Sequence, residues 1–316
     1  MRRRLSLLLF SLFLASQQAM AADTGPRLVS EDLARFWHAH DLAAAEPDPE
    51  RRAAIWQAEY LDRGSEGLRA FTRLRIGDGG KLAAAVDAAP AYYASLRWQP
   101  ERLAKMEPEI HEAVASLSRL LPWAEIPDVH FLIGRMNSGG TLDDVGLLIG
   151  LEMFGRENGT PEHELGDWHR QVLRGMDGLP AIVVHELVHY QQQWSFEGQP
   201  TLLQAALNEG VADFVTELAI GRHINGHVHA WAEPRAAELW REFLARKDGS
   251  DYAGWLYDGG VGDRPADLGY WMGYRIARAY YERAGDKAQS LRDMLAIGDA
   301  EAFLEASGLA GEFARP

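Results

Sequence analysis

Two histidines and a glutamate with helical spacing are the residues of this chain best suited to chemistry. They are His185, Glu186 and His189, in the run AIVVHELVHY. Residues four apart on an α-helix lie on the same face, so both imidazoles can turn toward one metal ion at about 2.0–2.1 Å. Glu186 lies roughly 100° further round the helix, where it can reach a water molecule without binding the metal. The spacing therefore predicts a metal site with a general base beside it.

The surroundings of these three residues favour a metal over a purely structural network. Pro180 suits the start of a helix, no helix breaker follows between residues 181 and 190, and apolar side chains flank the trio on nearly every side. Such a helix should be buried. Burying imidazoles and a carboxylate without partners is costly, and a bound cation removes that cost. The alternative is a hydrogen-bonded His/Glu network within the core.

A third metal ligand is expected from a second helix. A break at residues 198–200 precedes a helical pattern over residues 202–220, which contains Glu209 and Asp213. These two acids are four residues apart and share a face. Glu209 would bind the metal, while Asp213 would hold a ligand imidazole by its other nitrogen. The alternative is that both acids are solvated on a helix surface, but their position soon after the two histidines favours ligation.

The combination HExxH followed by ExxxD resembles the gluzincin metallopeptidases, which are zincins with a glutamate as third ligand. The chain is also similar to the bacterial predicted zinc-dependent proteases related to a gliding-motility lipoprotein, over roughly residues 125–285. That similarity rests on the stretches VHFLIG, SGG, LLIG, HELVHYQQ, NEGVAD and GYWMGYR. The resemblance implies one zinc ion per chain, His185, His189 and Glu209 as ligands, Glu186 as catalytic base and Asp213 as the orienting carboxylate.

The N-terminal residues are expected to be a secretion signal. Arg2 to Arg4 form a basic segment, residues 5–15 are apolar, and Ala19-Met20-Ala21 matches a cleavage site. The apolar stretch is shorter than the about 20 residues that span a membrane, and the chain has no cysteine for a lipid anchor. We expect cleavage after Ala21 and a periplasmic or secreted protein without a membrane anchor.

Composition limits the partners. The formal net charge is −14, and removal of residues 1–21 takes away three arginines and no acid. An acidic protein of this kind is not expected to bind nucleic acid or anionic lipid. The acidic balance leaves open a preference for cationic substrates or a role in solubility alone. Without cysteine there are no disulfides, so packing must supply the stability.

The remaining patterns predict a predominantly helical α+β fold with a zincin-like catalytic core, a small sheet beside the HExxH helix and a helical N-terminal region. Helices are expected over residues 31–45, 49–64, 65–75, 81–96 and 100–121, and strands over 129–133 and 146–154, joined by a turn at 137–140. After the signal, residues 22–122 would form the helical region and 123–316 the metallohydrolase core with a helical C-terminal part. One continuous domain over 22–316 is the alternative.

Substrate binding and transition-state stabilisation have weaker candidates. In zincins an edge strand beside the motif helix pairs with an extended substrate, and the resemblance suggests that role for Gly146, Leu147, Leu148, Ile149 and Gly150. An ordinary core strand is the alternative for these residues.

Gluzincins often stabilise the transition state with a tyrosine or histidine. Tyr270 and Tyr274, on a helix expected over residues 268–284, are candidates, with core packing as their alternative. His223, in the run HINGHVH, is a third candidate. The same histidine cluster could instead bind a second metal or be solvated in a loop.

Together these patterns predict a zinc-dependent metallohydrolase, with a peptidase acting on peptides or proteins as the favoured activity. One rival is an envelope binding or assembly factor with a structural zinc site, and another is a metal-free helical scaffold. Glu186 favours catalysis, because a structural site needs no base. Cleavage specificity and oligomeric state do not follow from the sequence.

Overall fold

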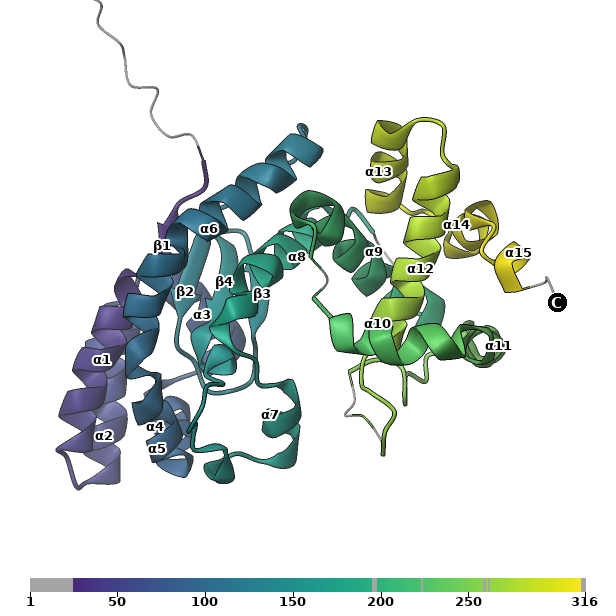
Figure 1. The fold of residues 1–316 in the computed structure, drawn as a ribbon. Coiled ribbons are helices and arrows are strands. Elements are labelled where there is room, and N and C mark those ends of the chain that lie inside the picture. Colours follow the sequence, from purple (N-terminus) through teal and green to yellow (C-terminus); the bar gives the residue numbers. More distant parts are fainter. Residues whose placement is uncertain (1–24, 195–197, 223, 258–259, 261, 314–316) are drawn as a thin grey trace, which may run out of the picture.

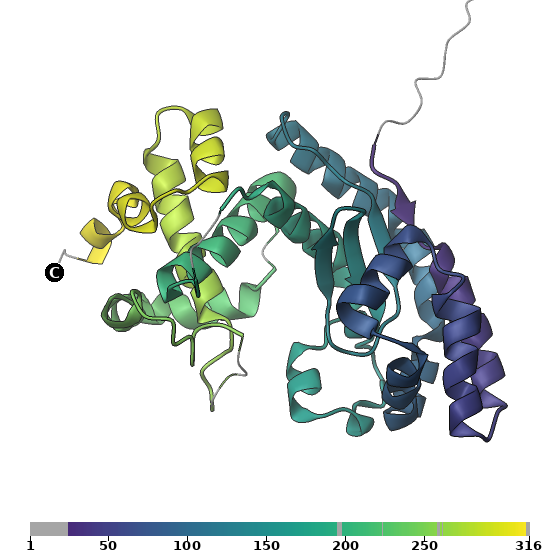
Figure 2. The same cartoon turned by 180° about the vertical axis from the view of Figure 1, so that it is seen from behind.

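The fold divides into two groups of elements with one helix between them. The computed structural model describes residues 25–194, 198–222, 224–257, 260 and 262–313. Six helices and the sheet form the N-terminal group, and α9 to α15 form the C-terminal group (Figures 1 and 2). Helix α8, Leu179–Gln191, runs between the two groups and carries the HELVH motif. From this position α8 packs against α6 of the N-terminal group and against α9 of the C-terminal group.

The N-terminal helices follow the sequence pattern, with local departures. They are α1 (Glu31–Ala44), α2 (Pro49–Ile55), α3 (Glu66–Phe71), α4 (Gly79–Ala88), α5 (Pro90–Ser95) and α6 (Gln99–Leu120). The helices expected over 49–64 and 65–75 both end in π-helical turns, Trp56–Leu61 and Thr72–Ile76. The helix expected over 81–96 divides at Pro90, because proline has no N–H to continue the hydrogen-bond ladder.

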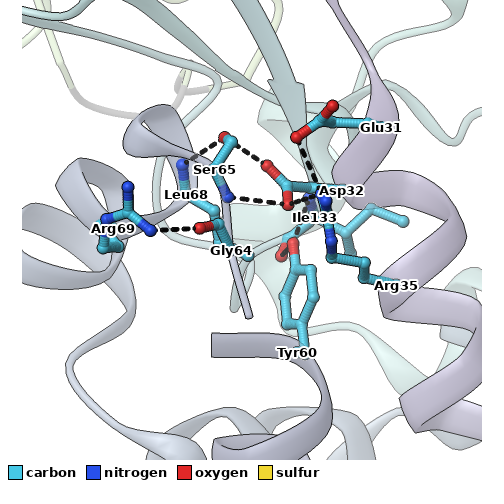
Figure 3. Close-up of polar contacts among 9 residues, drawn as sticks. All are labelled: Glu31, Asp32, Arg35, Tyr60, Gly64, Ser65, Leu68, Arg69 and Ile133. Atoms are coloured by element: carbon cyan, nitrogen blue, oxygen red, sulfur yellow. Dashed lines mark hydrogen bonds and ion pairs between the residues drawn. The ribbon is translucent and has the colours of Figure 1, made fainter. Parts of the chain in front are cut away.

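A buried carboxylate fastens these helices together. Asp32 of α1 is 1% exposed. Its carboxylate accepts hydrogen bonds from the backbone N–H of Ser65 at 3.1 Å and from the hydroxyl of Ser65 at 2.5 Å. It also accepts one from the guanidinium of Arg35 at 2.7 Å (Figure 3). Nearby, the hydroxyl of Tyr60 donates to the carbonyl of Ile133 at 2.8 Å and accepts from its N–H at 3.1 Å. These contacts fix α1 against α3 and tie the helices to the end of strand β2.

The sheet has four strands in the order β1-β2-β4-β3. Strands β1 (Leu28–Val29), β2 (Val129–Leu132) and β4 (Gly146–Gly150) are parallel, whereas β3 (Gly140–Asp143) runs antiparallel to β4. The expected strand at 129–133 is confirmed as β2, and the one expected over 146–154 ends at Gly150 and continues as a 3-10 turn. The turn expected at 137–140 leads into β3. This strand was not predicted, because Gly139 and Gly140 are typical of turns.

The edge strand is β3 and not β4. Strand β4 pairs with β2 on one side and with β3 on the other. All five of its residues, Gly146, Leu147, Leu148, Ile149 and Gly150, are buried. The prediction that these residues form a substrate-binding edge is therefore wrong, because their backbone is already paired on both sides. Among the described strands, none pairs with the outer side of β3.

The C-terminal group is helical. It contains α9 (Leu202–Ile220), α10 (Gly226–Ala232), α11 (Ala236–Arg246), α12 (Leu268–Arg283), α13 (Lys287–Leu295), α14 (Ala300–Ser307) and α15 (Ala310–Phe313). The short helix α7 (Asp167–Val172) precedes α8 and belongs to neither group. The helix expected over 202–220 is confirmed as α9, and the one expected over 268–284 as α12.

Two glycines allow α9 and α12 to cross with their backbones in contact. A Cβ on Gly273 would lie 1.8 Å from the carbonyl oxygen of Ala206, and one on Gly210 would lie 2.1 Å from the backbone of residues 273 and 274. Neither contact is possible for a side chain. The crossing therefore depends on glycine at both positions, and it sets where the N-terminal turn of α12 lies beside α8.

The predominantly helical α+β fold is confirmed. Buried residues of the described chain form a core cluster that extends from Leu33 to Leu309, while the division at residue 122 stays a prediction. The expected signal, residues 1–21, lies outside the described residues. In the part of the chain that the structure describes, no helix has both the length and the apolar composition needed to cross a membrane.

Candidate metal centre and the cleft around it

Three donor atoms from two helices converge at the interface of α8 and α9. Nε2 of His185 lies 3.0 Å from Nε2 of His189, which lies 3.2 Å from Oε2 of Glu209. The third separation, from Nε2 of His185 to the same carboxylate oxygen, is 3.4 Å. Among the described residues these three form the one group of acids and imidazoles that could hold a metal ion.

The three separations fit a tetrahedral zinc ion. Ligands bound at about 2.0–2.1 Å in a tetrahedron stand about 3.3 Å apart, which matches the spacing of this group. His185 and Glu209 are 5% and 8% exposed, so both side chains are largely shielded from bulk water. Two imidazoles and one carboxylate form a donor set that zinc prefers. The residues present therefore fit the ion.

Asp213 fixes the orientation of the first imidazole. Its Oδ1 lies 2.8 Å from Nδ1 of His185, and its Oδ2 accepts a hydrogen bond from the side-chain amide of Asn225 at 3.0 Å. Burial by itself lowers the pKa of His185, but Asp213 and Glu209 outweigh it and raise that pKa to about 10. The negative charge that raises the pKa also favours a bound cation. With Nδ1 facing a carboxylate, Nε2 is directed toward the donor group.

A glutamine performs the same task for the second imidazole. Nδ1 of His189 lies 2.7 Å from Oε1 of Gln192, and the amide nitrogen of Gln192 donates to the carbonyl of Asn208 at 2.8 Å. This contact assigns the N–H to Nδ1 and leaves Nε2 free to bind a metal. The amide is in turn anchored to α9, so the ring orientation depends on both helices.

Glu186 is left without a partner beside the donor group. The structure assigns its half-buried carboxylate no hydrogen bond or ion pair with any described residue. Strand β3 leaves room for it, since a Cβ on Gly140 would lie 2.7 Å from Cδ of Glu186. A carboxylate in this position is available to accept a proton from a molecule bound in the cleft.

A cleft of three adjoining pockets opens beside Glu186. The β3 pocket, about 690 Å³, is lined by β3, Arg75 and Gln199. The Glu186 pocket, about 350 Å³, lies next to it and shares Gly140, His185 and Glu186 with it. The α7 pocket, about 870 Å³, continues beyond. Tyr257 and Tyr270 line all three. The donor group is thus open to a space large enough for several residues of a peptide.

Part of the chain matches the model of a protein family. A family model described as "Predicted Zn-dependent protease (DUF2268)" matches residues 171–304. The match supports a zinc protease family. It includes α8, α9 and α12 and therefore the three donor residues, Glu186 and Asp213. Comparison with the curated proteins and with the solved structures gave no match.

The two tyrosines expected at the site are placed differently. Tyr270 stacks on the ring of His185, with centroids 6.1 Å apart and planes inclined by 18°. The hydroxyl of Tyr274 instead donates to Glu217, its ring packs against His229, and it lines none of the three pockets. Four residues along a helix are about 6 Å of its axis, which takes Tyr274 beyond the donor group.

A third tyrosine was missed by the sequence patterns. The hydroxyl of Tyr257 donates to Oε1 of Glu209 at 2.9 Å, from a loop where its φ is 60°. Burial, and then the charge of Glu209, raise the pKa of Tyr257, so it keeps its proton. No repeat or spacing in the sequence marks this loop residue. His223, the remaining candidate, lies outside the described residues.

Proposed function

We propose that this protein is a secreted or periplasmic zinc-dependent hydrolase of the gluzincin type that cleaves peptide bonds. The observation that carries the proposal is the convergence of three donor atoms beside an unpaired Glu186 in an open cleft. The family match supports the zinc protease class, and the basic, apolar and A-x-A segments of residues 2–21 support secretion.

Each residue of the centre has a distinct task in this proposal. His185, His189 and Glu209 would hold the ion, with Asp213 and Gln192 keeping the two imidazoles in orientation. Bound zinc would supply Lewis acidity, which makes water a better nucleophile near neutral pH and polarises a carbonyl.

Glu186 would act as the base and then as the acid. Its carboxylate takes a proton from the attacking water and later passes it to the leaving amine. Water attacks the carbonyl carbon directly, so no acyl-enzyme forms. The hydroxyl of Tyr257, which keeps its proton, replaces Tyr274 as the candidate donor to the developing oxyanion. Tyr270 stays a candidate through its position over His185.

Strand β3 would bind the peptide backbone. Its outer side is not paired with any described strand, and Gly140 lies against Glu186. An extended peptide can add to such an edge through main-chain hydrogen bonds, as in other cases of strand addition. This arrangement brings the bond to be cut close to the base.

The decisive test is Glu186→Gln, which keeps the size of the side chain and removes its basicity. Zinc content and melting temperature should stay near those of the wild type, because the residue is not a ligand. Hydrolysis of a peptide library should fall by about 10²–10⁴-fold. Glu238→Gln, at an exposed position of α11, is the matched control and should retain full activity.

Chelation provides the second arm of the test. Hydrolysis by the wild type should stop with a chelator and return with added zinc. A wild-type protein that holds zinc but cleaves no peptide in the library would favour the rival function, an envelope factor with a structural metal. Equal cleavage by Glu186→Gln and wild type would show that the assigned base is wrong.

A further inference from the structure

One of the arginines that line the α7 pocket forms no ion pair with any described residue. Three arginines line the α7 pocket: Arg156, Arg174 and Arg222. Arg156 forms an ion pair with Glu162 at 2.8 Å, and Arg222 forms one with Glu109 at 2.7 Å. Within the described residues, the side chain of Arg174 makes no hydrogen bond or ion pair. Of the three arginines that line this pocket, Arg174 is therefore the one whose positive charge is not paired with a carboxylate of a described residue.

The acids that line the α7 pocket form no ion pair with Arg174. Two acids line the same pocket, but Asp177 is engaged by Arg102 at 2.5 Å, and Asp267 forms no ion pair with Arg174. Burial, and then the charge of Arg174, lower the pKa of His227 on the facing wall. The guanidinium is half-buried. A cation in such a position is stabilised strongly by a carboxylate, which a guanidinium can bind through two parallel hydrogen bonds.

Arg174 also reaches the reaction centre. It lines the Glu186 pocket together with Glu186 and His185, so the two pockets meet at this side chain. Trp168 and Ile182 line both pockets beside it. Apolar walls around one unpaired cation are suited to a group with an aliphatic stem and a charged end.

The course of β3 gives this pocket a direction along the substrate. The β3 pocket is lined by Gly140 to Leu142, whereas the Glu186 pocket is lined by Asn137 to Gly140. Antiparallel pairing is the commoner arrangement of neighbouring strands. A peptide paired antiparallel with β3 would therefore have its N-terminal half in the β3 pocket and its C-terminal half near Arg174.

We propose that Arg174 binds a carboxylate of the substrate on the C-terminal side of the bond that is cut. This proposal rests on the proposed peptidase function and names its substrate class. The carboxylate has two sources: the side chain of an aspartate or glutamate, or the C-terminus of a short peptide. This pocket would therefore select an anionic group, whereas the acidic net charge of the chain is compatible with a preference for cationic substrates.

Three pools of short peptides separate these sources. The first has neutral side chains and an amidated C-terminus, the second has the same side chains and a free C-terminus, and the third is amidated but carries one glutamate at varied positions. The wild type should cleave at least one carboxylate-bearing pool about 10–100-fold faster, in kcat/KM, than the neutral pool. Mass spectrometry of the products should place the carboxylate after the cleaved bond.

Two variants tie the preference to one side chain. Arg174→Gln should remove the preference, mainly through KM, so that the carboxylate-bearing pools are cleaved no faster than the neutral pool. Arg222→Gln, which removes a charge from the same pocket but one already paired with Glu109, should keep the preference. Equal cleavage of all pools by the wild type, or an unchanged preference in Arg174→Gln, would overturn the proposal and leave the peptidase function standing.

Binding distinguishes failure of the pocket from failure of the proposed function. Calorimetric titration of zinc-loaded Glu186→Gln with the same pools measures recognition without turnover. If no pool is cleaved by the wild type, the peptidase function fails. Tighter binding of a carboxylate-bearing pool, lost in the Glu186→Gln/Arg174→Gln double variant, would still support the pocket. Equal binding of all three pools would overturn it.

Discussion

The network around Asp32 and the donor group around Glu209 both surround a buried carboxylate with polar side chains, yet they differ in how their atoms match. At Asp32 each contact joins an N–H or O–H donor to an oxygen acceptor (Figure 3). At Glu209 two imidazole nitrogens and one carboxylate oxygen lie within 3.4 Å of one another, and the two ring protons available are too few to give each of the three contacts its own hydrogen bond. The first arrangement is complete by itself, whereas the second is completed by a cation.

Their surroundings differ in the same sense. Asp32 lies between α1 and the start of α3 and lines none of the three pockets of the cleft. Glu209 lines the β3 pocket, and an unpaired Glu186 stands beside its imidazole partners. A buried polar cluster with matched donors and acceptors stabilises a fold, while metal-ligating atoms that converge beside open space indicate a binding site.

The largest difference is expected for zinc. Glu209→Ala should lose most of the bound zinc and all zinc-dependent hydrolysis, because two imidazoles remain where three ligands are needed. Asp32→Ala should keep one zinc per folded chain. Metal analysis after dialysis against a weak chelator measures both. Full zinc occupancy in Glu209→Ala would move the third ligand elsewhere, and His223 would be examined first.

Stability should show the reverse order. Asp32→Ala leaves the half-buried N–H and hydroxyl of Ser65 without their acceptor, which should lower the free energy of unfolding by about 1–3 kcal/mol. Urea denaturation of the zinc-free protein measures this loss. In the zinc-free state Glu209→Ala should be destabilised less than Asp32→Ala, since Asp213 still lies 2.8 Å from Nδ1 of His185. A larger loss in Glu209→Ala would mean that its cluster is also a structural network.

A smaller effect on zinc binding is expected for Asp213, which contacts a proposed ligand and is not itself a ligand. Asp213→Ala removes the oxygen 2.8 Å from Nδ1 of His185 and frees Asn225, but it leaves all three donors in place. Zinc affinity should fall by about 10–100-fold, as losses of such orienting partners commonly do. Competition with a fluorescent zinc chelator measures the change. An affinity equal to that of the wild type would show that packing alone holds the imidazole.

The parts of the site that were predictable are those set by helix periodicity. The bounds of α9, the burial of α8 and the shared faces of its two histidines and of Glu209 with Asp213 all follow from spacings of four residues. The sheet was harder, because short strands leave little pattern. Gly139 and Gly140 indicated a turn, although Gly140 begins β3. A side chain at Gly140 would collide with the carboxylate of Glu186, which explains the glycine there.

The sequence by itself determined which side chains share a helix face, because backbone hydrogen bonds impose the same period on any helix. Only the tertiary structure decided which faces meet. Tyr257 reaches Glu209 from 48 positions away, and Arg174 lies unpaired because its neighbours in the pocket already have partners. The crossing of α9 and α12 at Gly210 and Gly273 sets the position of Tyr270. Such contacts depend on the packing of distant segments, for which no local spacing exists.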